Sequence, residues 1–84
     1  MARGAEYSLY IMIDMLKALL AYEQAGRTPS TYEIAQFMKK DQSVVIRYRN
    51  LLEKLGLIVV RPEGPRNLII LTSKGRCLAK CLVS

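Results

Sequence analysis

The sequence predicts a mainly α-helical fold that carries one small β-hairpin, an α+β arrangement in the order α-α-α-β-β-α. A long apolar segment without internal proline or glycine opens the chain, and such a segment is typical of a helix. Two shorter segments with helical spacing follow, joined by a short polar turn. Two β-branched apolar runs then flank a segment rich in proline and glycine, which indicates a hairpin. The expected elements are a helix over residues 6–25, a helix-turn-helix over 31–55, a hairpin over 57–72 and a last helix over 73–83, all in one domain that spans 1–84.

Size and charge limit what the protein can do. Its 84 residues make one small domain with a modest core, and small domains often gain stability by pairing. Lys and Arg number 13 against 7 acidic residues, which gives a net charge of +6. The excess lies beyond residue 25, where eleven basic residues stand against four acids. This balance favours an anionic partner.

Several function classes are excluded by residue types that the sequence lacks. Without histidine there can be no imidazole metal site and no Ser-His-Asp triad. No glycine-rich phosphate loop or pair of catalytic carboxylates is recognisable, so we expect neither an enzyme nor a bound cofactor or metal. Asp14 and Lys17 interrupt the apolar run 9–21, which argues against a signal peptide or a membrane span. We therefore expect a soluble cytoplasmic protein with no membrane partner.

The first expected helix is apolar around most of its circumference. The residues at core spacing are Leu9, Met12, Leu16, Leu19 and Leu20, and apolar residues also fall on the other faces. Such a helix should be buried on more than one side, and so small a domain cannot wrap it. A second subunit is therefore expected to cover it, although a wide internal core face would also explain the pattern. Tyr7, Tyr10 and Tyr22 lie away from the basic half of the chain and are expected to be core or interface aromatics.

The segment 31–55 has the features of two helices joined by a tight turn. Ser30 or Thr31 can cap the first helix, and Gly56 is suited to end the second. The polar residues 39–42 form the turn between them. The inner face of the second helix is expected to contain Val45, Tyr48, Leu51 or Leu52, and Leu55. Together with the hairpin and the last helix, this is the element order of a winged helix-turn-helix.

Two motifs in this region carry a resemblance to a known family. The segment LLEKLGLIVVRPEGPRNLIILTSKGR (51–76) resembles the second half of MarR- and ArsR-type winged-helix transcription regulators. The matching residues are Leu52, Glu53, Lys54, Gly56, Leu57 and Ile58, then Leu71, Thr72, Lys74 and Gly75. The segment TYEIAQFMKKDQSVVIRYRNLL (31–52) resembles the helix-turn-helix of the same regulators, with Ile34 and Ala35 on the supporting helix. The resemblance implies double-stranded DNA as the partner, with recognition helix 43–55 in the major groove and the wing at the minor groove or the phosphates.

The recognition helix offers most of the candidate DNA contacts. Arg47 falls where the family often carries a DNA-contacting arginine; it could pair with guanine, bind a phosphate or remain a solvated surface charge. Its helical face also contains Gln42, Ser43, Ile46 and Asn50, each able to contact a base or to be a cap or plain surface. Arg49 departs from the family, which usually buries an aliphatic residue there, so its head group is expected to reach a phosphate or an acidic neighbour. Tyr48 is expected mainly in the core.

Further basic residues lie in the wing and in the turn. Arg61 and Arg66 flank the expected hairpin tip, and the acidic Glu63 within the tip favours Arg66 as the DNA contact. Lys39 and Lys40 lie in the helix-turn-helix turn, where they either clamp a phosphate or form a solvated face. Phosphate contacts of this kind add affinity without sequence information.

Cys77 and Cys81 lie four residues apart on one face of the last expected helix. Two small buried side chains are the simplest interpretation, and the alternatives are a redox sensor or an intersubunit disulfide. A bond between the two within one helix has unfavourable geometry, and two sulfurs alone make a poor metal site.

The leading hypothesis from the sequence is a small homodimeric transcription regulator that binds specific duplex DNA and pairs through its first and last helices. An architectural protein that coats DNA without sequence preference would use the same basic surface. A winged helix that binds another protein is the third hypothesis, but it would not need the positive charge of residues 26–84.

Overall fold

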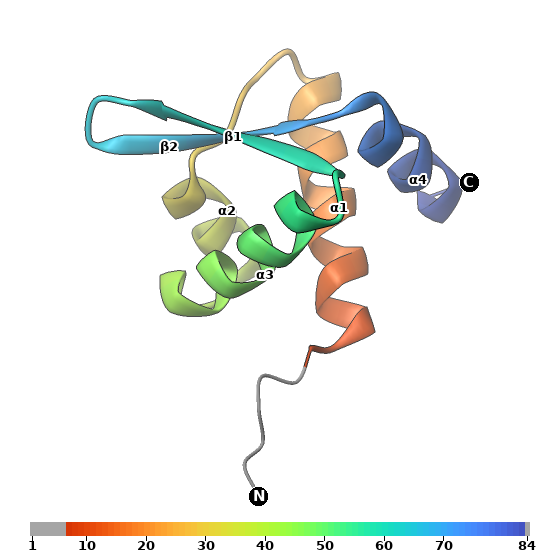
Figure 1. Ribbon diagram of the computed structural model, residues 1–84, viewed down its shortest axis with the longest axis horizontal. Coiled ribbons are helices and arrows are strands. Elements are labelled where there is room, and N and C mark those ends of the chain that lie inside the picture. Colours follow the sequence, from red (N-terminus) through yellow and green to blue (C-terminus); the bar gives the residue numbers. More distant parts are fainter. Residues whose placement is uncertain (1–6, 84) are drawn as a thin grey trace, which may run out of the picture.

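The computed structural model describes residues 7–83 and confirms the expected α+β arrangement. Figure 1 shows α2 and α3 packed against each other below the hairpin, with α4 on the far side of α1. The elements are α1 (Leu9–Gln24), α2 (Thr31–Met38), α3 (Gln42–Lys54), β1 (Ile58–Glu63), β2 (Arg66–Leu71) and α4 (Ser73–Val83).

The first helix begins later than expected. The expected start at residue 6 lies outside the described residues, and α1 itself begins at Leu9. Ser8 takes an extended backbone conformation, and its hydroxyl accepts the Ile11 N–H at 3.4 Å, which caps the helix. One side of α1 is fully buried and forms the centre of the core, through Met15, Leu16, Ala18, Leu19 and Leu20.

Local capping sets the bounds of α2. The Ser30 hydroxyl accepts the Glu33 N–H at 3.2 Å, and the Glu33 carboxylate accepts the Ser30 N–H at 2.8 Å. This capping box satisfies two N–H groups that the first turn of a helix leaves free. At the other end, Lys39 takes a left-handed conformation with φ of 58°, so α2 ends at Met38 and the chain turns into α3.

The end of α3 differs from the expectation in one residue. Val45, Tyr48 and Leu52 are buried as expected, but Leu55 is 45% exposed. Leu55 is the C-cap, and Gly56 follows it with φ of 77°, a left-handed conformation that glycine adopts readily. The chain therefore reverses at this point, and Leu57, which is 5% exposed, takes the core position instead.

The hairpin lies where it was expected, but its turn is shorter than expected. The ladder runs from Ile58 opposite Leu71 to Glu63 opposite Arg66, so only Gly64 and Pro65 lie in the turn. A lone hairpin is marginal in water, and this one is held against the helices. The Ile69 N–H donates to the Pro29 carbonyl at 2.9 Å. Ser30 also forms a β-bridge with Leu68, so the segment before α2 lies alongside β2.

The start of α4 is hydrogen-bonded to the segment that links α3 to β1. The Thr72 hydroxyl accepts the Gly75 N–H at 3.1 Å, as expected for a cap, and donates to the Gly56 carbonyl at 2.7 Å. The Thr72 N–H donates to the Leu57 carbonyl at 3.0 Å. Gly75 lies so close to this strand entry that a Cβ atom there would be 1.9 Å from the Leu57 carbonyl oxygen. Glycine at this position therefore allows α4 to pack directly on the backbone.

The interpretation of the two cysteines as buried side chains is wrong. Both Cys77 and Cys81 are exposed. The inner stripe of α4 is formed by Gly75 and Ala79, both buried, and residues two positions further along a helix point to the opposite side. None of the helices within residues 7–83 combines the length and hydropathy that a membrane span requires.

Candidate nucleic-acid interface

The outer face of α3 brings together most of the residues that the sequence singled out. Val45, Tyr48 and Leu52 turn one side of this helix into the core, which leaves the opposite side to solvent. The exposed residues on that side are Gln42, Ser43, Ile46, Arg47 and Asn50. Lys54, which the sequence analysis left as an ordinary surface charge, lies seven residues after Arg47 and four after Asn50, so it extends the same face.

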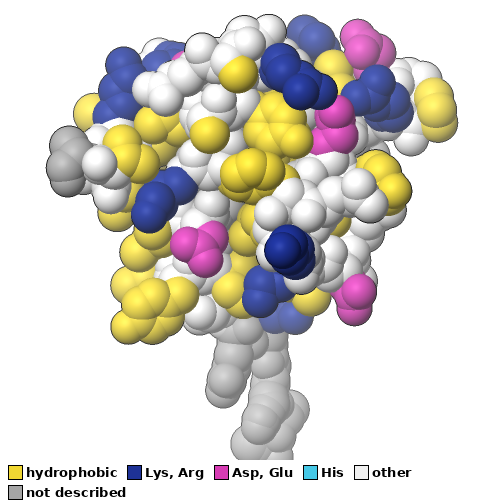
Figure 2. Space-filling view, turned by 180° about the vertical axis from the view of Figure 1, so that it is seen from behind, with side chains coloured by type: hydrophobic (Ala, Val, Ile, Leu, Met, Phe, Trp, Pro, Cys, Tyr) yellow, Lys and Arg dark blue, Asp and Glu magenta, His cyan; other side chains and the backbone are white. Residues whose placement is uncertain are grey.

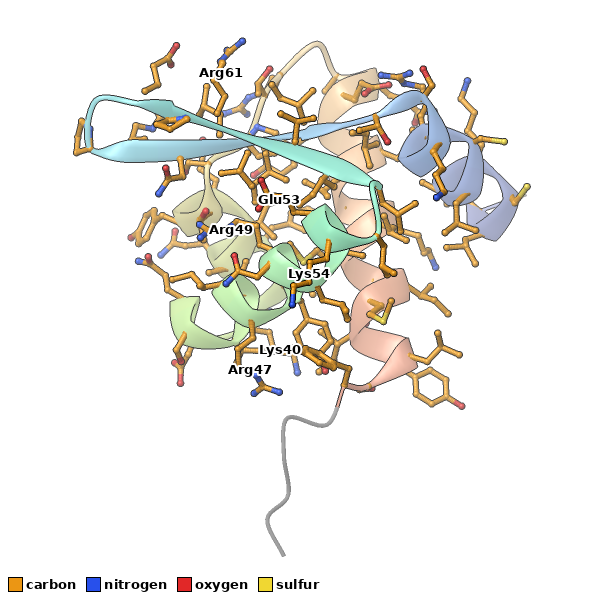
Figure 3. The ribbon with its side chains drawn as sticks, in the orientation of Figure 1. Lys40, Arg47, Arg49, Glu53, Lys54 and Arg61 are labelled. Atoms are coloured by element: carbon orange, nitrogen blue, oxygen red, sulfur yellow. The ribbon has the colours of Figure 1, made fainter. Side chains whose placement is uncertain are left out.

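Arg47 is held by two aromatic rings. Its guanidinium carbon lies 5.5 Å from the centroid of the Tyr7 ring and 5.8 Å from that of the Tyr48 ring. Both distances fall within the range of cation–π attraction. Figure 3 shows Arg47 on the side of α3 that faces away from the hairpin.

The two tyrosines are themselves fixed by the start of α1. Tyr48 is 3% exposed, as expected for a core residue, and its hydroxyl oxygen accepts the Ser8 N–H at 2.6 Å. The rings of Tyr7 and Tyr48 meet edge to face, with centroids 5.3 Å apart and an angle of 84° between their planes. The expectation that Tyr7 lies on the first helix away from the basic half is therefore wrong, because the residue precedes α1 and contacts the recognition helix.

Arg49 connects α3 to α2 and does not find the acidic neighbour that was expected. Its Nη1 donates to the Thr31 hydroxyl at 3.0 Å, and its Nη2 lies 3.5 Å from the Asn50 side-chain oxygen. Its Nε is buried and has no hydrogen-bond partner among the described residues. The Thr31 hydroxyl, at the start of α2, thus gives the Arg49 head group an acceptor within the fold.

A shallow depression of about 120 Å³ lies where α2, α3 and the hairpin turn meet. It is lined by the first turn of α2, by the outer side of α3 and by the residues that follow Gly64. The lining side chains include Tyr32, Gln42, Ile46, Arg49, Arg66 and Asn67. Arg49 and Arg66 give this depression a positive charge, and the partial positive charge at the start of α2 adds to it.

Arg66, in the wing, lines this depression and also pairs with an acidic residue of α2, Glu33. Its Nη2 lies 3.2 Å from the Glu33 carboxylate, which also lies 3.5 Å from Nη2 of Arg27. The pKa of Glu33 is held below its ordinary value, first by the hydrogen bond from the Ser30 N–H and then by the nearby Arg66. The wing arginine is thus tied to the capping box of α2, although its side chain remains 54% exposed.

The remaining predicted residues lie further from the face of α3. Arg61 points outward from the hairpin edge that faces away from α3, where it lies 3.9 Å from the Glu63 carboxylate. Lys39 and Lys40 are exposed beside the turn between α2 and α3, next to Gln42. Figure 3 shows Lys40 and Arg47 near the same end of the helix-turn-helix.

Three residues that the sequence analysis did not single out belong to this surface. Lys54 could have been found from its spacing on α3, since it repeats the face of Arg47 after two turns. Tyr32 and Asn67 carry no such signal. They join the depression only because the hairpin folds back over the start of α2.

The fold is similar to that of several solved structures. The protein AF1382 from Archaeoglobus fulgidus superposes with a TM-score of 0.86 at 20% identity, over 90% of this chain and 84% of that one. The MepR–DNA complex from S. aureus gives a TM-score of 0.75 at 25% identity, over 83% of this chain and 51% of MepR. The transcriptional regulator BldR from Sulfolobus solfataricus gives 0.73 at 21% identity, over 87% and 51%.

These similarities confirm the winged helix-turn-helix fold of this chain and its resemblance to winged-helix transcription regulators. This chain spans about half the length of MepR and BldR. No protein-family model and no curated protein sequence matches it.

Proposed function

We propose that this protein binds double-stranded DNA as a sequence-specific transcription regulator, with α3 in the major groove. The observation that carries the proposal is the outer face of α3, on which an arginine, two amides and a serine project from a helix whose other side is buried. Helices of this kind read bases with the residues of their first turns. The similarity to MepR, which was solved bound to DNA, supports the same use of the fold.

Each residue on the outer face of α3 has a chemical role in this proposal. Arg47 can donate two hydrogen bonds to guanine, and the amides of Gln42 and Asn50 can pair with adenine. Ile46, which is 36% exposed, can contact the methyl group of thymine. Ser43 is small enough to let the helix approach the groove floor and can donate to either a base or a phosphate.

Phosphates would be held on both sides of this reading face. Arg49 and Arg66 line the depression at the start of α2 and would hold a phosphate there. Lys39 and Lys40 would hold the strand beside the turn. Arg61, on the outer edge of the wing, would reach the flanking backbone or the minor groove. Each such contact makes binding weaker as the salt concentration rises.

A homodimer would be formed through α1 and α4. Leu9 and Tyr10 at the start of α1 are 64% and 81% exposed, and Leu78 and Val83 of α4 are 41% and 51% exposed. Figure 2 shows hydrophobic side chains along the edge of the molecule where α4 and the start of α1 lie. Exposed apolar surface of this kind favours a protein partner. Two copies related by a two-fold axis would present their recognition helices to half-sites about one helical turn apart.

A second candidate function is architectural DNA binding without sequence preference. The exposed Ile46 in the middle of the reading face favours it, because an aliphatic side chain tolerates many base sequences. In that case the arginines and lysines would serve the phosphate backbone alone. Either function places the protein with DNA in the cytoplasm and requires no catalysis.

Selection from a random duplex library at about 150 mM salt separates these functions. Wild type should enrich an inverted repeat, and Arg47→Ala should relax the preference at one position of each half-site by about 1–3 kcal/mol. Lys17→Ala is the matched control, since it removes a positive charge from α1, an element that does not belong to the reading face. Binding without enrichment, weakened evenly by Arg47→Ala, would favour the architectural function, and no binding by wild type would refute both.

A further inference from the structure

Arg47 is the central candidate for base reading, yet a free arginine side chain would be a poor reader. An exposed arginine samples many rotamers, and fixing it in one of them on binding costs conformational entropy. In this structure its guanidinium already lies against two rings, at 5.5 Å from the Tyr7 centroid and 5.8 Å from the Tyr48 centroid. The plane of the guanidinium attracts an aromatic face, while its N–H groups remain able to donate to a base or a phosphate.

The second ring, that of Tyr7, does not belong to the helix-turn-helix at all. It comes from the segment before α1 and meets the Tyr48 ring edge to face at 5.3 Å. The adjacent Ser8, which is the N-cap of α1, donates its backbone N–H to the Tyr48 hydroxyl at 2.6 Å. Three contacts therefore place Tyr7 beside Arg47: the ring pair, the Ser8 hydrogen bond and the cation–π contact.

Among these contacts, Tyr48 and Ser8 are fixed by the rest of the protein, and they in turn position Tyr7. Tyr48 is 3% exposed and cannot move without disturbing the core, and Ser8 is fixed by its role at the start of α1. Tyr7 is 42% exposed, and its ring contacts both Tyr48 and Arg47. The ring is thus positioned by buried groups and in turn limits where the Arg47 head group can go.

We propose that Tyr7 is a positioning residue for DNA binding: it holds the Arg47 guanidinium against Tyr48 so that the arginine meets its base or phosphate in a prepared orientation. The inference rests on the proposed DNA-binding function and adds to it a determinant that lies some 40 residues before the recognition helix. It also means that the start of α1 and the reading face of α3 act as one unit.

A double-mutant cycle tests the inference. The five proteins are wild type, Tyr7→Leu, Tyr7→Phe, Arg47→Ala and the double variant Tyr7→Leu with Arg47→Ala. Each is titrated against the fluorescein-labelled duplex that wild type enriches most in the selection, and its thermal unfolding is recorded in parallel. Tyr7→Phe keeps the ring face and serves as the conservative variant.

We expect Tyr7→Leu to weaken binding by about two- to fivefold, the effect of losing one exposed cation–π contact. Tyr7→Phe should bind like wild type, and Tyr7→Leu should have no further effect once Arg47 is absent. An equal loss in both backgrounds would mean that Tyr7 acts only through stability, and it would overturn the inference while leaving the DNA-binding function intact. Unchanged or tighter binding by Tyr7→Leu would overturn it as well. Failure of wild type to bind any duplex would refute the proposed function, and this inference with it.

Discussion

Replacing Gly75 with alanine tests the close contact between α4 and the backbone of Leu57, just before β1. On helix propensity alone, alanine in place of a glycine inside a helix should stabilise the protein by about 0.5–1 kcal/mol. The structure predicts the opposite result, because the new Cβ atom would lie 1.9 Å from the Leu57 carbonyl oxygen and 2.8 Å from its carbon. Carbon and oxygen atoms ordinarily approach to about 3.3 Å, so α4 would have to move away from the strand entry by more than 1 Å.

The magnitude follows from what this movement breaks. Overpacking against rigid backbone costs about 1–3 kcal/mol. The displaced helix would also weaken hydrogen bonds from Thr72 to the Gly56 and Leu57 carbonyls and from Lys74 to the Leu55 carbonyl, each worth about 1 kcal/mol. We expect a net loss of about 3–5 kcal/mol. A domain of this size has a total stability of about 4–12 kcal/mol, so the loss is a large part of it.

Thermal unfolding followed by far-UV circular dichroism measures the effect. At about 4–8 °C per kcal/mol, Gly75→Ala should lower the Tm by about 12–40 °C or abolish cooperative unfolding. The matched control is Gly64→Ala in the hairpin turn, where φ is +62° and nothing lies within 4 Å of the added Cβ. There only the left-handed conformation is strained, at about 1–2 kcal/mol. A Tm for Gly75→Ala that equals or exceeds that of wild type would refute the account of this junction.

Three further predictions concern the wing, the dimer and the thiols. The pKa of Glu33 is lowered in the folded protein, mainly by the Ser30 N–H. Its carboxylate therefore stabilises the fold at a pH above the ordinary glutamate pKa of about 4.3. This stabilisation is lost as the pH falls through the lower pKa of the folded protein. Glu33→Gln should therefore lose about 1 kcal/mol near neutral pH and show a flatter acid limb in urea titrations, whereas parallel curves for the two proteins would contradict this role. Tyr10→Glu places a charge in the exposed apolar surface and should shift the protein from dimer to monomer in light scattering, with an unchanged circular dichroism spectrum; a monomeric wild type would refute the proposed pairing. If α4 pairs across the dimer axis, mild oxidation should cross-link the dimer through the exposed Cys77 or Cys81, and the product should be visible on a non-reducing gel. A variant with serine at both positions should yield no cross-linked dimer. Oxidised wild type that stays monomeric would exclude the intersubunit disulfide.

Much of the fold could be predicted because its signals are local. Ser30 and Glu33 cap α2 through groups three residues apart, and Gly56 ends α3 by adopting a conformation that other residues rarely take. The apolar spacing of α1 correctly predicted the buried residues Leu16, Leu19 and Leu20, although Leu9 in the same series is 64% exposed. Each of these interactions depends on neighbours in the chain, so the sequence alone contains enough information to place them.

The side chains of the candidate site were harder to predict, because their environments come from distant segments. Arg49 was expected to reach an acid or a phosphate; packing places the Thr31 hydroxyl beside it in place of an acid, and the phosphate contact stays a prediction. The α3 face could be read from periodicity, whereas the depression beneath the wing forms only when the hairpin folds back over α2. Helical spacing shows which residues share a face, but it does not show what another element brings to that face.

The sequence by itself therefore determined the order of the elements, the caps of α2, the end of α3 and the outward face of the recognition helix. Only the tertiary structure decided that Leu55 is left out of the core, that both cysteines face solvent and that the Tyr7 ring contacts Arg47. The physical reason is the range of the interactions. Caps and turns are settled within four residues, whereas the Ser8–Tyr48 hydrogen bond joins groups 40 residues apart and exists only once α1 and α3 have packed.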